Sequence, residues 1–495
     1  MQNVSEPIKK YLASPIFQLA LIIFTSLLVY IFAFLLPINL LDLYDQPRLD
    51  VYLLYDRGRP AYWALRVAFI AVWGLYLLGY RVSLKVGAEA VKGQQQRGLW
   101  ILILIGMLAF IVVFLFVAPF DAADIYDNIM HGRILGVYHA NPFQQVIANY
   151  PDDPFYEYAA WKMAVSAYGP LWESMAGFTA WLAGSGIVAN VIVFKLLPGL
   201  FHLAGIGILA LFLKREAPEK ALSGVLLLGW NPLVLYETWG NGHNDVVMAF
   251  WFLLAAWWIM YRRYTLAVLS LLVGALIKFL PVLLVPAVFW IAWQNLESLS
   301  ARLMYLVRTG AIGLITVIAA YYPLWDGYAS LSIGRRMNMF ATSIPAAIYH
   351  NLKITLGADE SARLISLVAF GLLTIFVLFQ SSRIKPSSHD FLQVTFNILV
   401  FYLLFTCLWF QQWYGVWLVC LAPFIPPKSR DIALVFSFWV ISKQLVFSPI
   451  YVSTLYRHPE TYPILEPRYV LTVLGVPLFY ALWILIRCKK QYVEI

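Results

Sequence analysis

Polar and charged side chains gather in the segment Pro119–Phe143, directly behind a long apolar run. Within it Asp124, Asp127, Asn128 and His131 are spaced i, i+3, i+4 and i+7, so on a helix they share one face. A carboxylate on this face could take a proton from an acceptor hydroxyl, which is general-base chemistry. The same spacing also describes the solvated face of a helix on the outer surface, and the residues alone leave both interpretations open.

A second polar cluster, Gly240–Asp245 (GNGHND), stands at the predicted start of an apolar helix. Its asparagines and Asp245 could cap that helix, because free N–H groups and a positive dipole end favour such residues. Four hydrogen-bonding side chains between apolar helices are, however, typical of a functional site. Asp124, His131, His243 and Asp245 could also bind a divalent metal, although their spacing is not diagnostic of one.

Further candidates follow later in the chain. Lys278 lies between two short apolar pieces, where it either extends to an interface or faces an external cavity as a cation for a phosphate. Arg335 and Arg336 are weaker candidates for the same work, because arginines are ordinary in an exposed loop. The aromatic residues of Gln411–Tyr414 (QQWY) fit an aromatic belt at a membrane interface as well as a platform on which a sugar stacks.

The composition predicts a membrane protein made of helices. Of the 495 residues, 62% are hydrophobic and only 12% are charged, against about 25% charged in soluble domains. The net charge of +9 is interpreted as cytoplasmic loops rather than a nucleic-acid partner, because no basic and aromatic module is present. Cys407, Cys420 and Cys488 have neither disulfide-framework nor zinc spacing.

Apolar runs of near-spanning length predict an all-α polytopic protein with about fourteen transmembrane helices, in a range of 12–14. The expected spans are residues 16–38, 61–80, 99–118, 187–213, 220–238, 244–261, 264–278, 279–293, 308–323, 361–380, 391–410, 412–425, 430–448 and 469–487. We expect an N-terminal pair with an inner loop in residues 1–98, a catalytic core in 99–425 with the external loop 119–186, and a C-terminal pair in 426–495.

Lys and Arg clusters orient these spans, because they favour the cytoplasmic side. With Lys9 and Lys10 inside, the polar segment 119–143 falls on the outer face and both termini are cytoplasmic. The apolar piece Tyr168–Gly184 is ambiguous, since counting it as a crossing would place Lys214–Lys220 outside. We therefore expect it to lie along the outer interface, helped by Glu173 and its aromatic residues.

Taken together, these motifs resemble the GT-C class of membrane glycosyltransferases, most closely the mannosyltransferases that depend on polyprenol-phosphate-mannose. The matching residues, in the family's order, are Asp124-Ile-Tyr126, His131-Gly132-Arg133, Gly136, Asn141-Pro142-Phe143, Tyr168-Gly-Pro170-Leu171, Trp230-Asn231-Pro232-Leu233, Gly242-His243-Asn244-Asp245, Lys278 with Leu280-Pro281, and Gln412-Trp413-Tyr414. The ensemble covers about residues 115–425 and is more specific than any single motif.

The resemblance implies an enzyme with Asp124 as catalytic general base and Asp245 assisting at the donor or acceptor. It implies a polyprenyl-phosphate sugar donor, a glycan or glycolipid acceptor, and inversion at the anomeric carbon. The residues expected to bind substrate are Asp127, His131, Arg133, Tyr168, His243, Asn244, Lys278, Arg335, Arg336, Gln412, Trp413 and Tyr414. The polyprenyl chain needs an apolar groove between spans, which we expect near Pro281.

Two departures from the family pattern bear on the substrate. The chain has Tyr168-Gly-Pro-Leu where relatives often have Tyr-Pro-Pro-Leu, and His131 where relatives often have an aspartate. A transporter or flippase of lipid-linked sugars and a non-catalytic GT-C relative are the alternative functions. A transporter is expected to have internal repeats and to carry polar groups near the bilayer midplane. Here the polar groups concentrate in the predicted external loops. The resemblance also implies that the membrane is a prokaryotic cell membrane.

Overall fold

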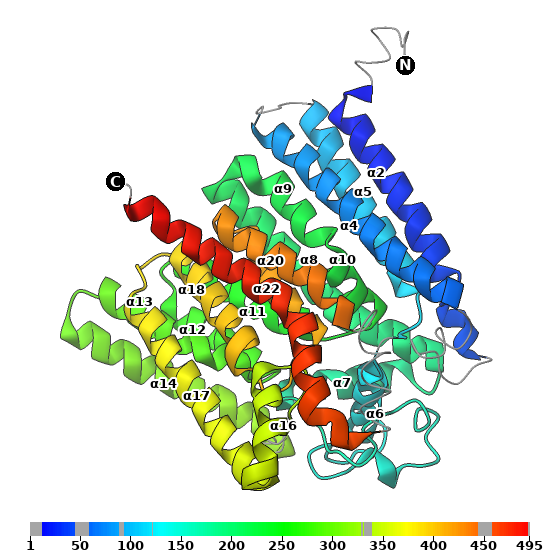
Figure 1. Ribbon diagram of the computed structural model, residues 1–495. Helices are drawn as coiled ribbons and strands as arrows, with labels where there is room; N and C mark the ends of the chain where they lie inside the picture. Colours follow the sequence, from blue (N-terminus) through cyan, green and yellow to red (C-terminus); the bar gives the residue numbers. More distant parts are fainter. Residues whose placement is uncertain are drawn as a thin grey trace.

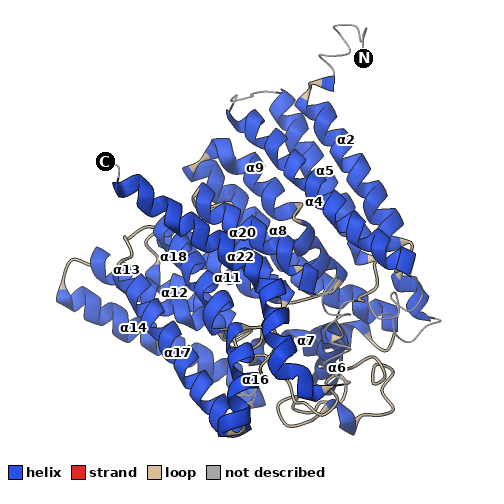
Figure 2. Ribbon diagram, viewed as in Figure 1, coloured by secondary structure: helices blue, strands red, loops and turns tan. Residues whose placement is uncertain are grey.

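The computed structural model describes residues 12–44, 59–88, 94–120, 122–327, 330, 339–443 and 458–493. Within these ranges the chain is helical and has no β-strand, only isolated bridges between Asn39 and Val117 and between Ala341 and Trp409 (Figure 2). The expected all-α fold of a polytopic membrane protein is therefore confirmed.

Eight helices of the described residues are long and apolar enough to cross a membrane. They are α2 (Pro15–Tyr30) with the π-helix η1 (Ile31–Leu35), α4 (Arg59–Ala88), α5 (Gln94–Leu115), α8 (Ile187–Glu216), α14 (Leu299–Tyr321), α17 (Ala358–Ser382), α18 (Ser388–Phe401) with η7 (Tyr402–Thr406), and α22 (Tyr462–Val493). The number of spans in the described residues rises to nine if one bent pair of helices counts as a single span. This pair consists of α10 (Pro232–Val234) with η4 (Leu235–Gly240), followed by α11 (Asp245–Met260).

Shorter helices lie between these spans. They are η2 (Leu40–Tyr44), α6 (Asp124–Gly136), η3 (Ile147–Asn149), α7 (Pro170–Ala183), α9 (Pro218–Gly229), α12 (Tyr264–Ala275), η5 (Leu280–Leu284), α13 (Val285–Asn295), η6 (Tyr322–Leu324), α16 (Ile344–Leu356), η8 (Gln412–Tyr414), α19 (Gly415–Leu421), α20 (Pro427–Val440) and η10 (Pro459–Thr461). All fourteen predicted apolar segments contain helix, but length does not decide whether the short helices among them cross. Helix α16 was not predicted.

The site-bearing elements collect at one end of the helical bundle. Helices α6 and α7 pack against each other there, while α2 begins and α22 ends toward the opposite end (Figure 1). Helix α11 lies inside the bundle and packs on α8, α12, α18 and α19. The polar segment behind α5 thus lies at one end of the bundle.

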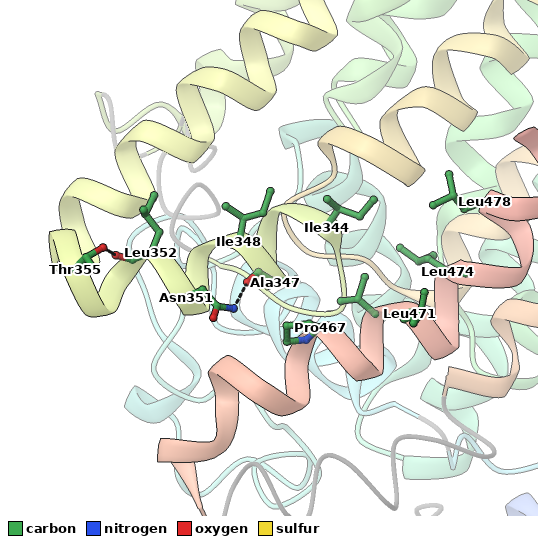
Figure 3. A pocket seen from close by; sticks show the side chains of 12 residues that line it. Ile344, Ala347, Ile348, Asn351, Leu352, Thr355, Pro467, Leu471, Leu474 and Leu478 are labelled. Atoms are coloured by element: carbon green, nitrogen blue, oxygen red, sulfur yellow. Dashed lines mark hydrogen bonds between the residues drawn. The ribbon is translucent and has the colours of Figure 1, made fainter.

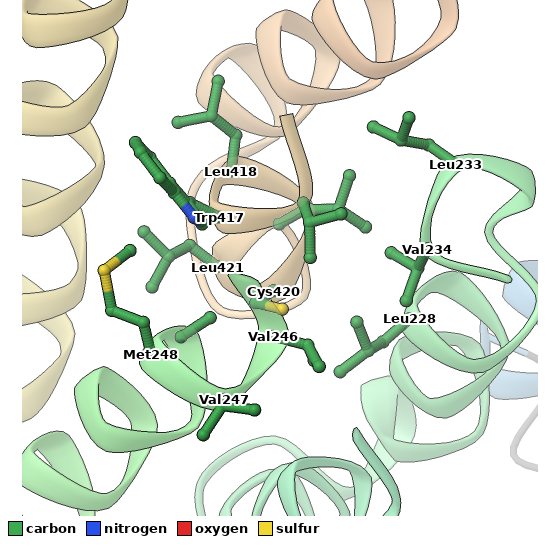
Figure 4. Packing of buried hydrophobic residues seen from close by; sticks show 14 of the residues in the cluster. Leu228, Leu233, Val234, Val246, Val247, Met248, Trp417, Leu418, Cys420 and Leu421 are labelled. Carbon is green, nitrogen blue, oxygen red and sulfur yellow. The ribbon is translucent and has the colours of Figure 1, made fainter. Parts of the chain in front are cut away.

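A buried apolar cluster fixes the start of α11. Val246, Val247 and Met248 pack with side chains of the neighbouring elements, including Leu233 of α10 and Trp417 of α19 (Figure 4). These side chains are almost completely buried. Close packing of these side chains holds the first turn of α11, with Asp245 as its first residue, in one position.

Of the two interpretations left open for α6, the solvated polar face does not hold, because Asp127, Asn128, His131 and Arg133 are buried. Residues 137–169, part of the predicted external loop and called the external loop below, bond to Asp127 and Arg133. One surface expectation on α7 was wrong. Glu173 of α7 is not an exposed marker of the headgroup layer but is fully buried. The aromatic side chains Phe178 and Trp181 of the same helix are exposed, as expected of an interfacial helix.

Candidate catalytic site

Helix α6 is held in place by close backbone contact with α7. A Cβ atom added at Gly136 would come within 2.0 Å of the Gly177 carbonyl oxygen, so only glycine permits this approach. Asp124 is the first residue of α6, where the positive end of the helix dipole favours a carboxylate. Its side chain is 26% exposed, in contrast to the buried polar residues that follow it.

The next polar residues of α6 hold the external loop. Asp127 Oδ1 accepts the backbone N–H groups of Ala160 and Trp161, each at 3.0 Å. Asn128 Oδ1 accepts the indole N–H of Trp172 at 2.9 Å. Both side chains border the cavity described below, but these bonds fix the loop that covers α6.

His131 and Arg133 are buried farther along α6. His131 Nε2 lies 3.3 Å from the Ala164 carbonyl oxygen, and burial lowers the pKa of His131 to about 4, so the ring is neutral at pH 7. Arg133 Nε lies 2.7 Å from Asp153 Oδ2, and its Nη1 donates to the Gly184 carbonyl at 2.7 Å. Arg133 thus ties the external loop to the end of α7, an arrangement that favours a structural role.

The bent pair brings the second polar cluster to α6. Asn231 caps α10 by accepting the N–H groups of Leu233 and Val234, and the chain then bends by 119° between η4 and α11. Gly242 in the break has φ +72°, and a Cβ there would meet Ile125 Cδ1 at 2.5 Å. The break is therefore packed directly on the first turn of α6.

Asp245 and Lys278 form a buried ion pair. Lys278 Nζ lies 2.8 Å from Asp245 Oδ2, and Trp417 Nε1 donates to Asp245 Oδ1 at 2.8 Å. The ammonium group also lies 5.4 Å from the ring centre of Tyr168 and 5.9 Å from that of Tyr414, within cation–π range. The break around Lys278 is present as predicted, since α12 ends before it and η5 begins after it.

The QQWY segment packs inward. The Trp413 ring stacks on the imidazole of His243, with centroids 3.9 Å apart and planes inclined by 19°. Tyr414 stacks on Trp417 at 4.4 Å, and Gln412 is buried. An aromatic belt facing lipid headgroups does not account for Trp413, whose exposed fraction is 8%.

Asp124 opens into a small cavity beneath the external loop. The cavity has a volume of about 110 Å³ and is lined by Asp124, Asp127, Asn128, His131, Trp161, Ala164, Val165, Ala167, Tyr168, Met339 and Trp409. His243 does not line the cavity, but its Nε2 atom lies 3.9 Å from Asp124 Oδ2. The structure therefore brings together Asp124, His131, His243 and Tyr168, which are far apart in sequence.

Other sequence candidates are placed differently. Asn244 caps α11 by position and is buried, with its Nδ2 lacking a hydrogen-bond partner among the described residues. Arg335 and Arg336 lie outside the described residues. No three His, Cys, Asp or Glu side chains within the described ranges gather in a metal-binding arrangement.

Glu237 was missed by the sequence analysis. It is fully buried on the π-helix η4, and its Oε2 lies 2.9 Å from His243 Nδ1. The signal was present, because Glu237 is a charged residue within the apolar run LVLYETW, where ionisable groups are rare and usually functional.

An apolar groove lies on another side of the molecule, between α16 and α22. It has a volume of about 670 Å³ and is lined by Ile344, Ile348, Leu471, Leu474 and Leu478 among others (Figure 3). Met339 of the cavity wall precedes Ile344 of the groove by five residues in sequence.

Comparison with known proteins identifies relatives of the chain. Residues 49–294 match the family described as Alpha-(1->6)-mannopyranosyltransferase, N-terminal domain. Over this part the chain is similar to these mannosyltransferases. Alpha-(1->6)-mannopyranosyltransferase A of Corynebacterium glutamicum is 22% identical over 244 residues, which cover 48% of this chain and 48% of that protein. The resemblance to GT-C mannosyltransferases is thereby confirmed.

The family match contains much of the site. Asp124, Glu237, His243, Asp245 and Lys278 all lie within residues 49–294, whereas the QQWY segment lies beyond them. The chain spans about half the length of the curated relative that it matches. No solved structure matches the chain.

Proposed function

We propose that this protein is an integral-membrane glycosyltransferase that moves a sugar, mannose, from a polyprenyl-phosphate donor to a glycan or glycolipid acceptor at the outer face of a prokaryotic cell membrane, with both termini cytoplasmic. The relationship to alpha-(1->6)-mannopyranosyltransferases supports the sugar and the reaction class. The polyprenyl-phosphate donor and the outer face rest on the sequence resemblance and on the charge pattern of the loops.

One observation supports Asp124 as the general base. Among the polar residues on its face of α6, Asp124 alone is partly exposed, while Asp127, Asn128 and His131 are buried. Its carboxylate borders the cavity, where an acceptor hydroxyl could approach. Asp124 would take the hydroxyl proton while the oxygen attacks the anomeric carbon from the side opposite the phosphate, which inverts that centre.

Lys278 is suited to stabilise the departing polyprenyl phosphate. It is a cation with 10% of its side chain exposed, fixed by Asp245 and flanked by the rings of Tyr168 and Tyr414. A preorganised cation stabilises charge that develops on a leaving oxygen in the transition state. Asp245 would then act by positioning Lys278, which is the form of assistance that the geometry supports.

The apolar groove between α16 and α22 is suited to the polyprenyl chain. Only two of its lining residues, Asn351 and Thr355, are polar. The groove expected near Pro281 stays a prediction.

A transfer assay tests the proposal. The purified full-length protein would be incubated in detergent with radiolabelled polyprenyl-phosphate-mannose and an alpha-mannan oligosaccharide, with heat-denatured protein as the control. Radiolabel in the oligosaccharide fraction would support the enzyme. Binding of the donor without transfer would favour a non-catalytic relative, and donor movement across vesicles without transfer would favour a flippase. Either of the last two results would overturn the proposed function.

A further inference from the structure

Glu237, Asn241 and His243 lie next to one another behind Asp124, and the proposed transfer reaction has not yet given them a role. Glu237 is 0% exposed, and its Oε2 lies 2.9 Å from His243 Nδ1 and accepts a hydrogen bond from Asn241 Nδ2 at 3.2 Å. The other carboxylate oxygen, Oε1, has no hydrogen-bond partner within the described part of the chain. Such a buried carboxylate is costly unless a neighbouring group compensates its charge.

The imidazole of His243 is held from several sides. Trp413 stacks on its face at 3.9 Å, and the His243 backbone N–H donates to the Glu237 carbonyl oxygen at 2.8 Å. The second ring nitrogen, Nε2, then faces Asp124 Oδ2 at 3.9 Å. The ring thus stands between a fully buried carboxylate and the carboxylate that borders the cavity.

The charges around the ring favour its taking up a proton. Three carboxylates surround the ring, namely Glu237 from η4, Asp124 from α6 and Asp245 from α11. Helix η8 contributes the uncharged Trp413 ring, and Lys195 of α8, which packs on Gly242, directs its ammonium group to backbone carbonyls near the end of α5. Lys278, the nearby cation, is already paired with Asp245. Glu237 therefore has no other cation in the described residues at ion-pair distance, and a protonated His243 would balance it.

We propose that Glu237 and His243 form a proton-accepting pair behind Asp124, with His243 receiving the proton that Asp124 removes from the acceptor. The inference rests on the proposed glycosyltransferase function. In the transfer step the acceptor O–H bond breaks and its proton goes to Asp124, the acceptor oxygen bonds to the anomeric carbon, and the sugar–phosphate bond breaks with its electron pair leaving on the phosphate. The proton then passes from Asp124 Oδ2 to His243 Nε2 and is released to water before the next cycle.

Glu237 is a positioning residue in this scheme, because it touches His243 and not the substrate. It orients Nδ1 inward, so that Nε2 is the nitrogen presented to Asp124. The 3.9 Å between the Asp124 and His243 atoms would have to shorten by about 1 Å for proton transfer, as catalytic contacts commonly do when substrate binds. The π-helical turn that places Glu237 here is a feature often found at functional sites.

The pH dependence of kcat tests the pair in the full-length protein, with saturating radiolabelled polyprenyl-phosphate-mannose and mannan oligosaccharide. Glu237→Gln keeps the shape of the side chain and removes its charge, so we expect kcat to fall about 100-fold with KM for the donor unchanged. The acid limb of the kcat profile should also move to lower pH by about one unit, because a carboxylate at this distance favours the protonated ring by that much or more.

Further variants separate chemistry from folding. Glu237→Asp should restore part of kcat and the wild-type acid limb, and His243→Asn should abolish that limb. Glu157→Gln changes an exposed carboxylate of the external loop and should behave as wild type. A lower kcat in Glu237→Gln without displacement of the acid limb would assign Glu237 a structural role only and overturn the pair. Wild-type kcat in Glu237→Gln would overturn it while leaving the enzyme standing, and no transfer by the wild-type protein would overturn both.

Discussion

The ion pair between Lys278 and Asp245 can be tested for two roles at once. The Nζ and Oδ2 atoms are 2.8 Å apart, and the two side chains are 10% and 1% exposed. Lys278→Met leaves the Asp245 carboxylate buried with the Trp417 indole as a hydrogen-bond donor and no paired cation among the described residues. Breaking a buried pair in this way costs about 3–5 kcal/mol, most of it the penalty of the uncompensated charge.

The double variant Asp245→Asn with Lys278→Met removes that penalty. The new amide keeps an oxygen that can accept from Trp417, so we expect the free energy of unfolding to return to within about 1–2 kcal/mol of the wild-type value. Turnover should nevertheless stay down by about 100-fold or more, because the cation proposed to stabilise the leaving phosphate is still missing.

Thermal unfolding in detergent and the radiolabel transfer assay, run on the same preparations, measure both effects. Lys162→Met provides the control, since Lys162 pairs with Glu157 at 3.6 Å on the surface and its loss should cost about 1 kcal/mol at most. Recovery of wild-type turnover in the double variant would refute the argument, because Lys278 would then serve only to neutralise Asp245. An unchanged Tm in Lys278→Met alone would refute the claim that breaking the ion pair destabilises the protein.

Two more outcomes follow from the site. Burial raises the pKa of Glu173 from 4.5 to about 7, an effect that the Ser166 hydrogen bond partly offsets. The protein should therefore lose about 3 kcal/mol of stability as the pH rises from 4.5 through 7. In thermal melts between pH 5 and pH 8, Glu173→Gln should remove that loss. An unchanged pH dependence in the variant would contradict the raised pKa of Glu173. Gly242→Ala forces a Cβ toward Ile125 at φ +72°, whereas Gly357→Ala strains the backbone at φ +82° and ψ 164° with nothing within 4 Å. Each should lose about 1–3 kcal/mol of stability, and only Gly242→Ala should also lose turnover. Equal turnover in the two variants would show that the contact with α6 does not matter.

The long helices were accessible to sequence reasoning because each is a long apolar run. Helices α5 and α8 carry few charged residues in their apolar windows and were predicted within a few residues of their ends. The break at Lys278 was predicted for a local reason, since Pro281 cannot donate to a continuing helix. Helix α16 was missed because it is short and carries polar residues, although the Ser343 cap followed by Pro345 was a usable start signal.

The site's contacts could not be predicted because they join segments distant in sequence. Lys278 was identified as a candidate cation, but its pairing with Asp245 depends on how α11 packs against α12 and η5. The burial of α6 depends on the fold of the external loop, which has little regular structure for a periodic pattern to report. Glu237 became a candidate only when the π-helix placed it against His243.

Turnover of Asp124→Asn is the measurement that tests the central claim most directly. The variant keeps the size of the side chain and removes the base, so kcat with radiolabelled polyprenyl-phosphate-mannose should fall about 100-fold or more, while donor binding and Tm stay near wild type. Asp152→Asn, an exposed carboxylate of the external loop, should retain full turnover as the matched control. Near-normal kcat in a folded Asp124→Asn protein would contradict the assignment of Asp124 as the general base.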